Sequence, residues 1–96
     1  MTRIDATVEV TALGFINSTR SKQTHHQLES FPRRMVWGDR EYTFAEMTMQ
    51  YLVRNGQQLV KLFDVTDGNT SYRLRLEDDR WTLVGTTGNN LVITRA

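Results

Sequence analysis

Three basic residues and one aromatic residue in the second half of the chain have the types and spacing of a nucleic-acid surface. Lys61 and Phe63 are two residues apart in one apolar segment, and Arg73 and Arg75 are two residues apart in the next. Alternate side chains of a strand share a face, so pairing of the two segments would gather the cations around a ring. Lys and Arg bind phosphates, and an aromatic ring stacks on a base. One hypothesis is therefore single-stranded nucleic-acid binding, and the competing interpretation is an ordinary solvated face.

Apolar residues on the same predicted face support a second hypothesis. The predicted strand pairing places Leu52, Leu59 and Phe63 outward together, beside the basic residues. An exposed apolar patch with a polar surround is typical of a site that binds a protein partner or a second copy of the chain. We prefer this hypothesis of a binding module. The predicted site comprises Leu52, Leu59, Lys61, Phe63, Arg73 and Arg75.

Catalytic and metal-binding chemistry has little support in the residue types present. A Ser or Thr nucleophile needs a neighbouring base, and the only two histidines, His25 and His26, are adjacent in a polar segment. Adjacent histidines rarely supply two ligands to one ion, and carboxylates at useful spacing are missing nearby. The acidic run 77–79 is typical of a turn, where Asp bonds its own backbone. We expect a non-enzymatic protein with no cofactor and no bound metal.

Four consecutive strands joined by short turns should position the predicted site. Alternating apolar residues indicate strands over 47–54, 58–65, 70–77 and 80–84. Asn55-Gly56 is typical of a two-residue hairpin turn, and it sets Leu52 opposite Leu59. The same counting from a turn at Asp78-Asp79 gives three pairs: Glu77 with Arg80, Leu76 with Trp81 and Leu74 with Leu83.

The turn at 66–69 decides which side chains face inward. A two-residue loop at Asp67-Gly68 would set Leu62 opposite Arg73 and mix apolar with basic side chains. A three-residue loop, with Asn69 in the left-handed conformation, sets Leu62 opposite Leu74 and keeps one continuous apolar face. We prefer this register, which places Lys61 opposite Arg75 and Phe63 opposite Arg73 on the outer face. The predicted core face is then Met49, Tyr51, Val53, Val60, Leu62, Tyr72, Leu74, Leu76, Trp81 and Leu83.

The remaining segments predict further strands around this meander. Alternation over 4–12 indicates a half-exposed strand, and a bulge or bend at Gly14 would explain the change of phase after it. The polar segment 17–30 is typical of a mobile surface loop. The segment 33–45 predicts a hairpin with a four-residue loop, which sets Trp37 opposite Tyr42 and Met35 opposite Phe44. A last short strand over 91–95 would help the sheet to close into a barrel or roll.

The segment 44–54 also fits a helix. Thr43 and Glu46 have capping-box spacing, and Gly56 lies where a residue just past a helix end is expected. We favour a strand, because apolar residues alternate from Met47 to Val53 and the following turn joins segments whose apolar residues pair. The predicted fold class is an all-β antiparallel barrel or roll. An α+β fold with a short helix at 44–54 is the alternative.

Bulk properties restrict the class of protein further. The chain has 96 residues, 39% of them hydrophobic and 24% charged, which is typical of one small domain over 1–96. A net charge of +1 does not by itself predict a polyanionic partner. The chain has no cysteine, so disulfides and thiolate chemistry are excluded. Its first residues lack the apolar run of a secretory signal, and we expect a cytoplasmic protein.

One pair of motifs resembles a known family. Arg33-Arg34 precedes Asp64-Val65-Thr66-Asp67-Gly68 along the chain. This order resembles the PilZ family of cyclic-dinucleotide receptors, in which an Arg-rich segment precedes a barrel strand with an Asp-x-Ser-x-x-Gly motif. Thr66 stands in place of the Ser and Asn69 in place of the last Gly. The resemblance covers a dozen residues and implies cyclic-dinucleotide binding as a further alternative.

Overall fold

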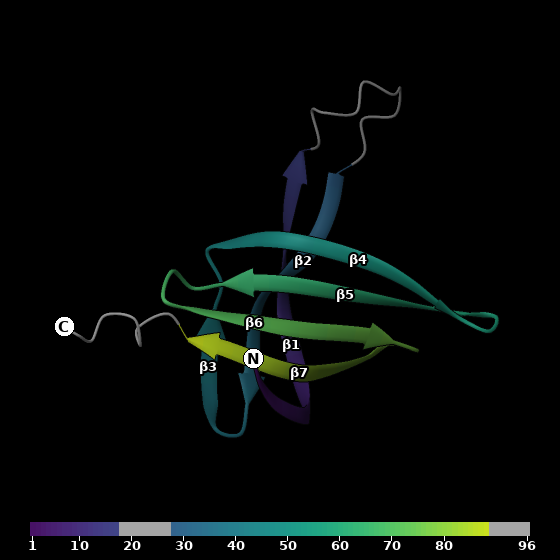
Figure 1. Ribbon diagram of the computed structural model, residues 1–96. Coiled ribbons are helices and arrows are strands. Elements are labelled where there is room, and N and C mark those ends of the chain that lie inside the picture. Colours follow the sequence, from purple (N-terminus) through teal and green to yellow (C-terminus); the bar gives the residue numbers. More distant parts are fainter. Residues whose placement is uncertain (18–27, 89–96) are drawn as a thin grey trace.

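The chain folds into a single antiparallel sheet of seven strands, as the computed structural model shows for residues 1–17 and 28–88 (Figure 1). The strands are β1 (Thr2–Asn17), β2 (Leu28–Trp37), β3 (Arg40–Thr43), β4 (Glu46–Asn55), β5 (Gln58–Thr66), β6 (Thr70–Glu77) and β7 (Arg80–Gly88). Their order in the sheet is β3-β2-β1-β7-β6-β5-β4. The prediction of an all-β fold is confirmed. The alternative of a helix at 44–54 is wrong, because β4 covers most of that segment.

The long first strand bends the sheet into a roll. β1 pairs with β7 near its beginning and with β2 over its second half, so it belongs to both halves of the sheet. The β1–β2 hairpin therefore crosses behind the meander β4–β7 (Figure 1). The link between β3 and β4 contacts both halves, since the Phe44 N–H donates to the Arg33 carbonyl at 2.8 Å and the Ala45 N–H to the Thr66 carbonyl at 2.7 Å. Because β3 and β4 do not pair with each other, the roll is open rather than a closed barrel.

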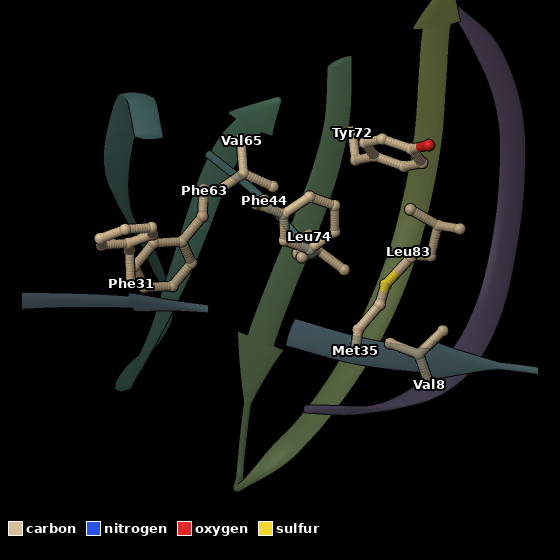
Figure 2. Close-up of a cluster of buried hydrophobic side chains, with 9 residues drawn as sticks. All are labelled: Val8, Phe31, Met35, Phe44, Phe63, Val65, Tyr72, Leu74 and Leu83. Carbon is tan, nitrogen blue, oxygen red and sulfur yellow. The ribbon is translucent and has the colours of Figure 1, made fainter. Parts of the chain in front are cut away.

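The core lies between the two crossing halves of the sheet (Figure 2). Its nine buried side chains are Val8, Phe31, Met35, Phe44, Phe63, Val65, Tyr72, Leu74 and Leu83. A Cβ on Gly14 would come within 2.7 Å of the Phe31 ring, so a side chain at Gly14 would collide with the core. The irregular pairing that we expected at Gly14 lies earlier, between Val10 and Leu13. Close packing against Phe31 therefore explains why residue 14 is a glycine, and the bulge lies before it, between Val10 and Leu13.

The β6–β7 hairpin has the predicted register. Asp78 and Asp79 form its turn with φ angles of 53° and 61°, and Leu76 pairs with Trp81 as expected. Glu77 also pairs with Arg80, and Leu74 with Leu83. Asp tolerates positive φ better than most residues, so an Asp-Asp pair can form this tight turn.

The β4–β5 hairpin is shifted by two residues from the predicted register. The turn residues are Gly56 and Gln57, so Leu52 lies opposite Lys61 rather than Leu59. Gly56 has a φ of 70°, which a glycine adopts without strain. A shift of two residues changes the pairs and leaves each side chain on its own face of the strand.

The β5–β6 connection is shifted by one residue, and this error exchanges the faces of β4 and β5. Thr66 pairs with Ser71, so Leu62 lies opposite Arg75 and not Leu74. The Asp67 carboxylate causes this register, because it accepts the N–H groups of Asn69 and Thr70, both at 2.9 Å. The glycine at 68, not Asn69, has the positive φ, at 104°. The predicted core face is therefore wrong for β4 and β5, where Met47, Phe63 and Val65 point inward.

Expectations for the other segments have mixed outcomes. The hairpin at 33–45 forms, but a two-residue turn sets Met35 opposite Tyr42 and Trp37 opposite Arg40. The predicted loop is shorter at both ends, since Asn17 belongs to β1 and 28–30 to β2. Its remaining part, and the predicted strand at 91–95, lie outside the described residues. Among the described residues there is no helix that could span a membrane.

Candidate functional site

The structure separates the six residues of the predicted site. Phe63 is a core residue, 3% exposed, with its ring centroid 5.4 Å from that of Trp81. Leu52, Leu59 and Lys61 share its side of the sheet, at the exposed end of the β4–β5 hairpin. Burial and register thus remove Phe63 from any surface that binds a partner.

The two arginines of the predicted site lie on the opposite face, which we call the outer face. On β6, Arg73 lies opposite Asp64 of β5, and Arg75 lies opposite Leu62 of β5. Facing pairs share a side of the sheet, so neither arginine lies beside Lys61 or Phe63. The predicted stripe of cations around an aromatic ring is therefore wrong, because one slip between β5 and β6 divides it between two faces.

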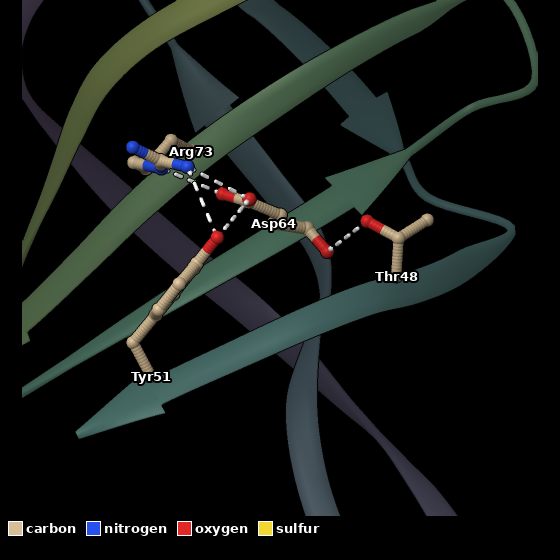
Figure 3. Close-up of polar contacts among 4 residues, drawn as sticks. All are labelled: Thr48, Tyr51, Asp64 and Arg73. Atoms are coloured by element: carbon tan, nitrogen blue, oxygen red, sulfur yellow. Dashed lines mark hydrogen bonds and ion pairs between the residues drawn. The ribbon is translucent and has the colours of Figure 1, made fainter.

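A polar cluster on the outer face connects β4 to β5 and β6 (Figure 3). The Arg73 guanidinium donates two hydrogen bonds to Asp64, from Nε to Oδ1 at 2.8 Å and from Nη2 to Oδ2 at 2.9 Å. The Tyr51 hydroxyl donates to Asp64 Oδ2 at 3.4 Å, and its ring lies 5.2 Å from the Arg73 guanidinium carbon. The hydrogen bond to Asp64 is the main cause of the raised pKa of Arg73. Asp64 thus binds the guanidinium of Arg73 at two nitrogens, and this ion pair links β5 to β6.

A shallow cleft of about 430 Å³ adjoins this cluster on the outer face. It is lined by Val53, Arg54, Val60, Leu62, Arg73, Arg75, Glu77 and Val84. Arg75 Nε lies 3.6 Å from a Glu77 carboxylate oxygen and has no hydrogen-bond partner. The cleft has apolar walls from β4 and β5, and it continues to the edge of the sheet at β4.

The edge at β4 is a long exposed feature of the described part of the chain. β4 has ten residues and pairs with β5 alone in this part of the chain. Its central run, 47–53, contains no charged residue. Both faces of the run are exposed, with Met49 50% and Val53 42% accessible on the outer face and Leu52 60% on the inner face. We call this feature the β4 edge.

Backbone groups of alternate β4 residues point toward the open side. The two-residue turn makes Asn55 and Gln58 a hydrogen-bonded pair, and such pairs alternate along an antiparallel ladder. Gln50, Leu52 and Arg54 occupy the other positions, so their N–H and C=O groups turn away from β5. An edge of this kind is a template for one more strand.

The residues of the cyclic-dinucleotide motif have other partners. Asp64 binds Arg73, and Arg34 lies 3.9 Å from Glu41. Burial raises the pKa of Asp67. Hydrogen bonds from the Thr70 and Asn69 amides and from the Tyr72 hydroxyl lower it by more than burial raises it, so the pKa lies below its usual value. Among the residues described, no group of three His, Asp or Glu could hold a metal ion. The adjacent histidines, His25 and His26, lie outside the described residues.

Sequence reasoning missed the β4 edge, although one signal for it was present. The run 47–53 is uncharged, whereas charge is a usual protection of an edge strand. What the sequence did not indicate is that β4 would be an edge, since this depends on the order of all seven strands. Comparisons with protein families, curated proteins and solved structures found no match to this chain.

Proposed function

We propose that this protein is a non-enzymatic protein-binding module that takes an extended segment of a partner polypeptide as an extra strand on β4. One observation carries the proposal: a ten-residue edge strand has an uncharged central run that is exposed on both faces. In binding by strand addition, main-chain hydrogen bonds provide affinity and alternate side chains provide specificity. The β4 edge offers both kinds of contact.

The backbone of β4 supplies the first kind of contact. Gln50, Leu52 and Arg54 each direct an N–H and a C=O group to the open side, which gives a partner strand six groups to pair. Within the uncharged run this edge is protected by a bulge at Thr48, between the pairs of Met47 and Met49. The bulge limits regular addition to the part of β4 that follows it.

The side chains of β4 supply the second kind of contact. Tyr51 and Val53 on the outer face and Leu52 on the inner face are 36%, 42% and 60% exposed. A partner strand would bury them further, and each buried methylene is worth about 0.8 kcal/mol. Binding to an apolar segment is therefore favoured over binding to a charged one. The nucleic-acid hypothesis lacks comparable support, since Phe63 is buried and Arg73 is bound by Asp64.

The test uses isotopically labelled protein and a synthetic peptide with the sequence of 46–55 as the extended probe. In dilute solution, where the protein is monomeric, we expect the amides of Gln50, Leu52 and Arg54 to exchange rapidly without the peptide and to become protected when it binds. Leu52→Pro removes one outward N–H that has no partner within the sheet, so it should weaken binding of the peptide. Leu13→Lys changes a similarly exposed leucine on β1, which three strands separate from β4 in the sheet, and should leave binding intact. Protection confined to β3 or to the outer cleft would refute the proposal.

A further inference from the structure

We propose that the strand added to β4 is β4 of a second copy of this chain, paired antiparallel about a two-fold axis at Leu52. This inference rests on the proposed function, because it names the partner that the β4 edge binds. The uncharged run 47–53 allows two copies of the edge to meet without repulsion between like charges. The net charge of the chain, +1, adds little long-range repulsion between the copies.

The regular part of β4 selects the register of the pair. A bulge at Thr48 interrupts the pairing at one end, and the turn that follows Asn55 ends it at the other. Between them 49–55 forms a regular run of seven residues, and Leu52 is its middle residue. Antiparallel strands about an axis at Leu52 use the whole run, whereas an axis one residue to either side uses five residues. The longest ladder therefore has Leu52 at its centre.

The side chains that meet in this register are compatible. Leu52 faces Leu52 of the second copy on the inner side of the sheet, and Tyr51 faces Val53 on the outer side. Arg54 faces Gln50, so no two charges of like sign are opposite each other. An axis at Arg54 would instead bring two guanidinium groups together, which disfavours that register.

The cluster at Tyr51 prepares one of these contacts in the single chain. The Tyr51 hydroxyl bonds Asp64, and Arg73 lies over its ring, so the side chain is held on the outer face before any partner arrives. A side chain that is already ordered loses less conformational entropy on binding. Tyr51 of each copy thus presents a fixed surface to Val53 of the other.

The first experiment measures mass by analytical ultracentrifugation from micromolar to millimolar concentration. We expect a reversible monomer–dimer equilibrium, weak because a two-strand interface is smaller than about 1,200 Å². Leu52→Lys places two ammonium groups next to the axis and should raise the dissociation constant at least about tenfold. Leu13→Lys introduces the same charge on β1, which three strands separate from β4 in the sheet, at a leucine of 50% exposure, and should leave the dissociation constant within about twofold.

The second experiment tests the register itself. The chain has no cysteine, so Leu52→Cys introduces a single thiol at the axis. Hydrogen-bonded residues opposite each other have Cα atoms about 5.5 Å apart, a separation that a disulfide can span. Under mild oxidation this variant should form a covalent dimer rapidly, while the matched variant Leu59→Cys should form one at least about tenfold more slowly.

The outcomes separate this inference from the proposed function. A dimer that cross-links through Leu52→Cys supports both. A protein that is monomeric at every concentration, with β4 amides that exchange rapidly and become protected by the 46–55 peptide, overturns the second copy and keeps strand addition. A dimer that cross-links faster through Leu59→Cys overturns the axis at Leu52. Protected β4 amides in a monomer without peptide would show that the edge is covered within the chain, which overturns both.

Discussion

The two edges of the sheet differ in length, charge and support. β3 has four residues, among them Arg40 and Glu41, whereas β4 has ten residues with an uncharged run at 47–53. Short edge strands and charged side chains are the common means by which proteins prevent edge-to-edge association. β3 has both protections, whereas β4 has a bulge near its beginning and charges only near its ends, at Glu46 and Arg54. The difference is the reason why we propose β4, and not β3, as the edge that takes a partner strand.

Each edge strand carries a tyrosine, Tyr42 on β3 and Tyr51 on β4, and different contacts hold the two side chains in place. Tyr42 of β3 packs on Tyr72 at a centroid distance of 5.8 Å, and Tyr72 is a core residue whose hydroxyl bonds Asp67. Tyr51 of β4 is held only by the surface cluster of Asp64 and Arg73. Tyr42 is therefore held by the core, while Tyr51 is held by polar contacts that leave the neighbouring apolar side chains of β4 exposed.

The largest effect should come from breaking the point where the two edges meet. Phe44 lies in the link between β3 and β4 and is fully buried beside Tyr72, at 5.1 Å between ring centroids. Phe44→Ala should lower the free energy of unfolding by about 3–5 kcal/mol, because it leaves a large cavity. Urea denaturation measures this loss. Leu59→Ala, at an exposed site, should change it by less than about 0.5 kcal/mol. Equal effects of the two changes would show that the link is not part of the core.

How much of this architecture the sequence predicts depends on the range of the interactions involved. The β6–β7 hairpin was predictable, because Asp78 and Asp79 make a turn from local preferences and the pairs Leu76–Trp81 and Leu74–Leu83 follow by counting. The membership of Met35 and Phe44 in the core followed from their size and apolar character. These features depend on neighbouring residues alone.

The β5–β6 register was not predictable from the apolar pattern. β5 has apolar residues on both faces, with Phe63 and Val65 inward and Val60 and Leu62 outward, so the pattern satisfies two registers equally. The choice depends on the Asp67 carboxylate, which bonds the amides after it and selects the longer turn. The candidate site was missed for a related reason, since an edge strand is defined by the order of all the strands.

The second largest effect concerns the anchor of β3 at high pH. Burial is the main cause that raises the pKa of Tyr72 to about 12, and the charge of Asp67 adds to it. The folded state therefore favours the neutral hydroxyl, while the unfolded chain releases the proton near pH 10. The stabilisation is complete below pH 10 and is lost between about pH 10 and 12, at up to about 1.4 kcal/mol per pH unit.

Denaturation curves across this pH range test the anchor. Tyr72→Phe lacks the ionising group, so its stability should fall less steeply than that of the unchanged protein over the same range. Protection factors of the β3 amides, which correct for the rise of intrinsic exchange with pH, should fall over this range in the unchanged protein, because Tyr42 packs on Tyr72. Parallel curves for the two proteins would show that the Tyr72 hydroxyl ionises equally in the folded and unfolded states.

A smaller effect is expected from the anchor of β4. Asp64→Asn removes the carboxylate that binds Arg73 and Tyr51. In the ion pair, the Arg73 side chain is 32% exposed and the Asp64 side chain 18%. Solvent screens a pair of this exposure, so unfolding should become easier by only about 1 kcal/mol. Amide exchange at Met49, Tyr51 and Val53, whose N–H groups bond β5, should rise while exchange in β3 stays constant. A rise at both edges would show that the cluster supports the whole sheet and not β4 alone.

The smallest effect is expected where the charges of β3 are removed. The double substitution Arg40→Val and Glu41→Val, made together with Leu52→Lys, gives β3 an uncharged edge in a protein whose β4 edge is blocked. β3 turns the backbone groups of only Glu41 and Thr43 outward, since Trp37 and Arg40 close its two-residue turn as a hydrogen-bonded pair. Sedimentation should therefore show a monomer, with stability within about 0.5 kcal/mol of Leu52→Lys alone. Dimers of this variant would mean that charge, rather than length, keeps β3 from associating.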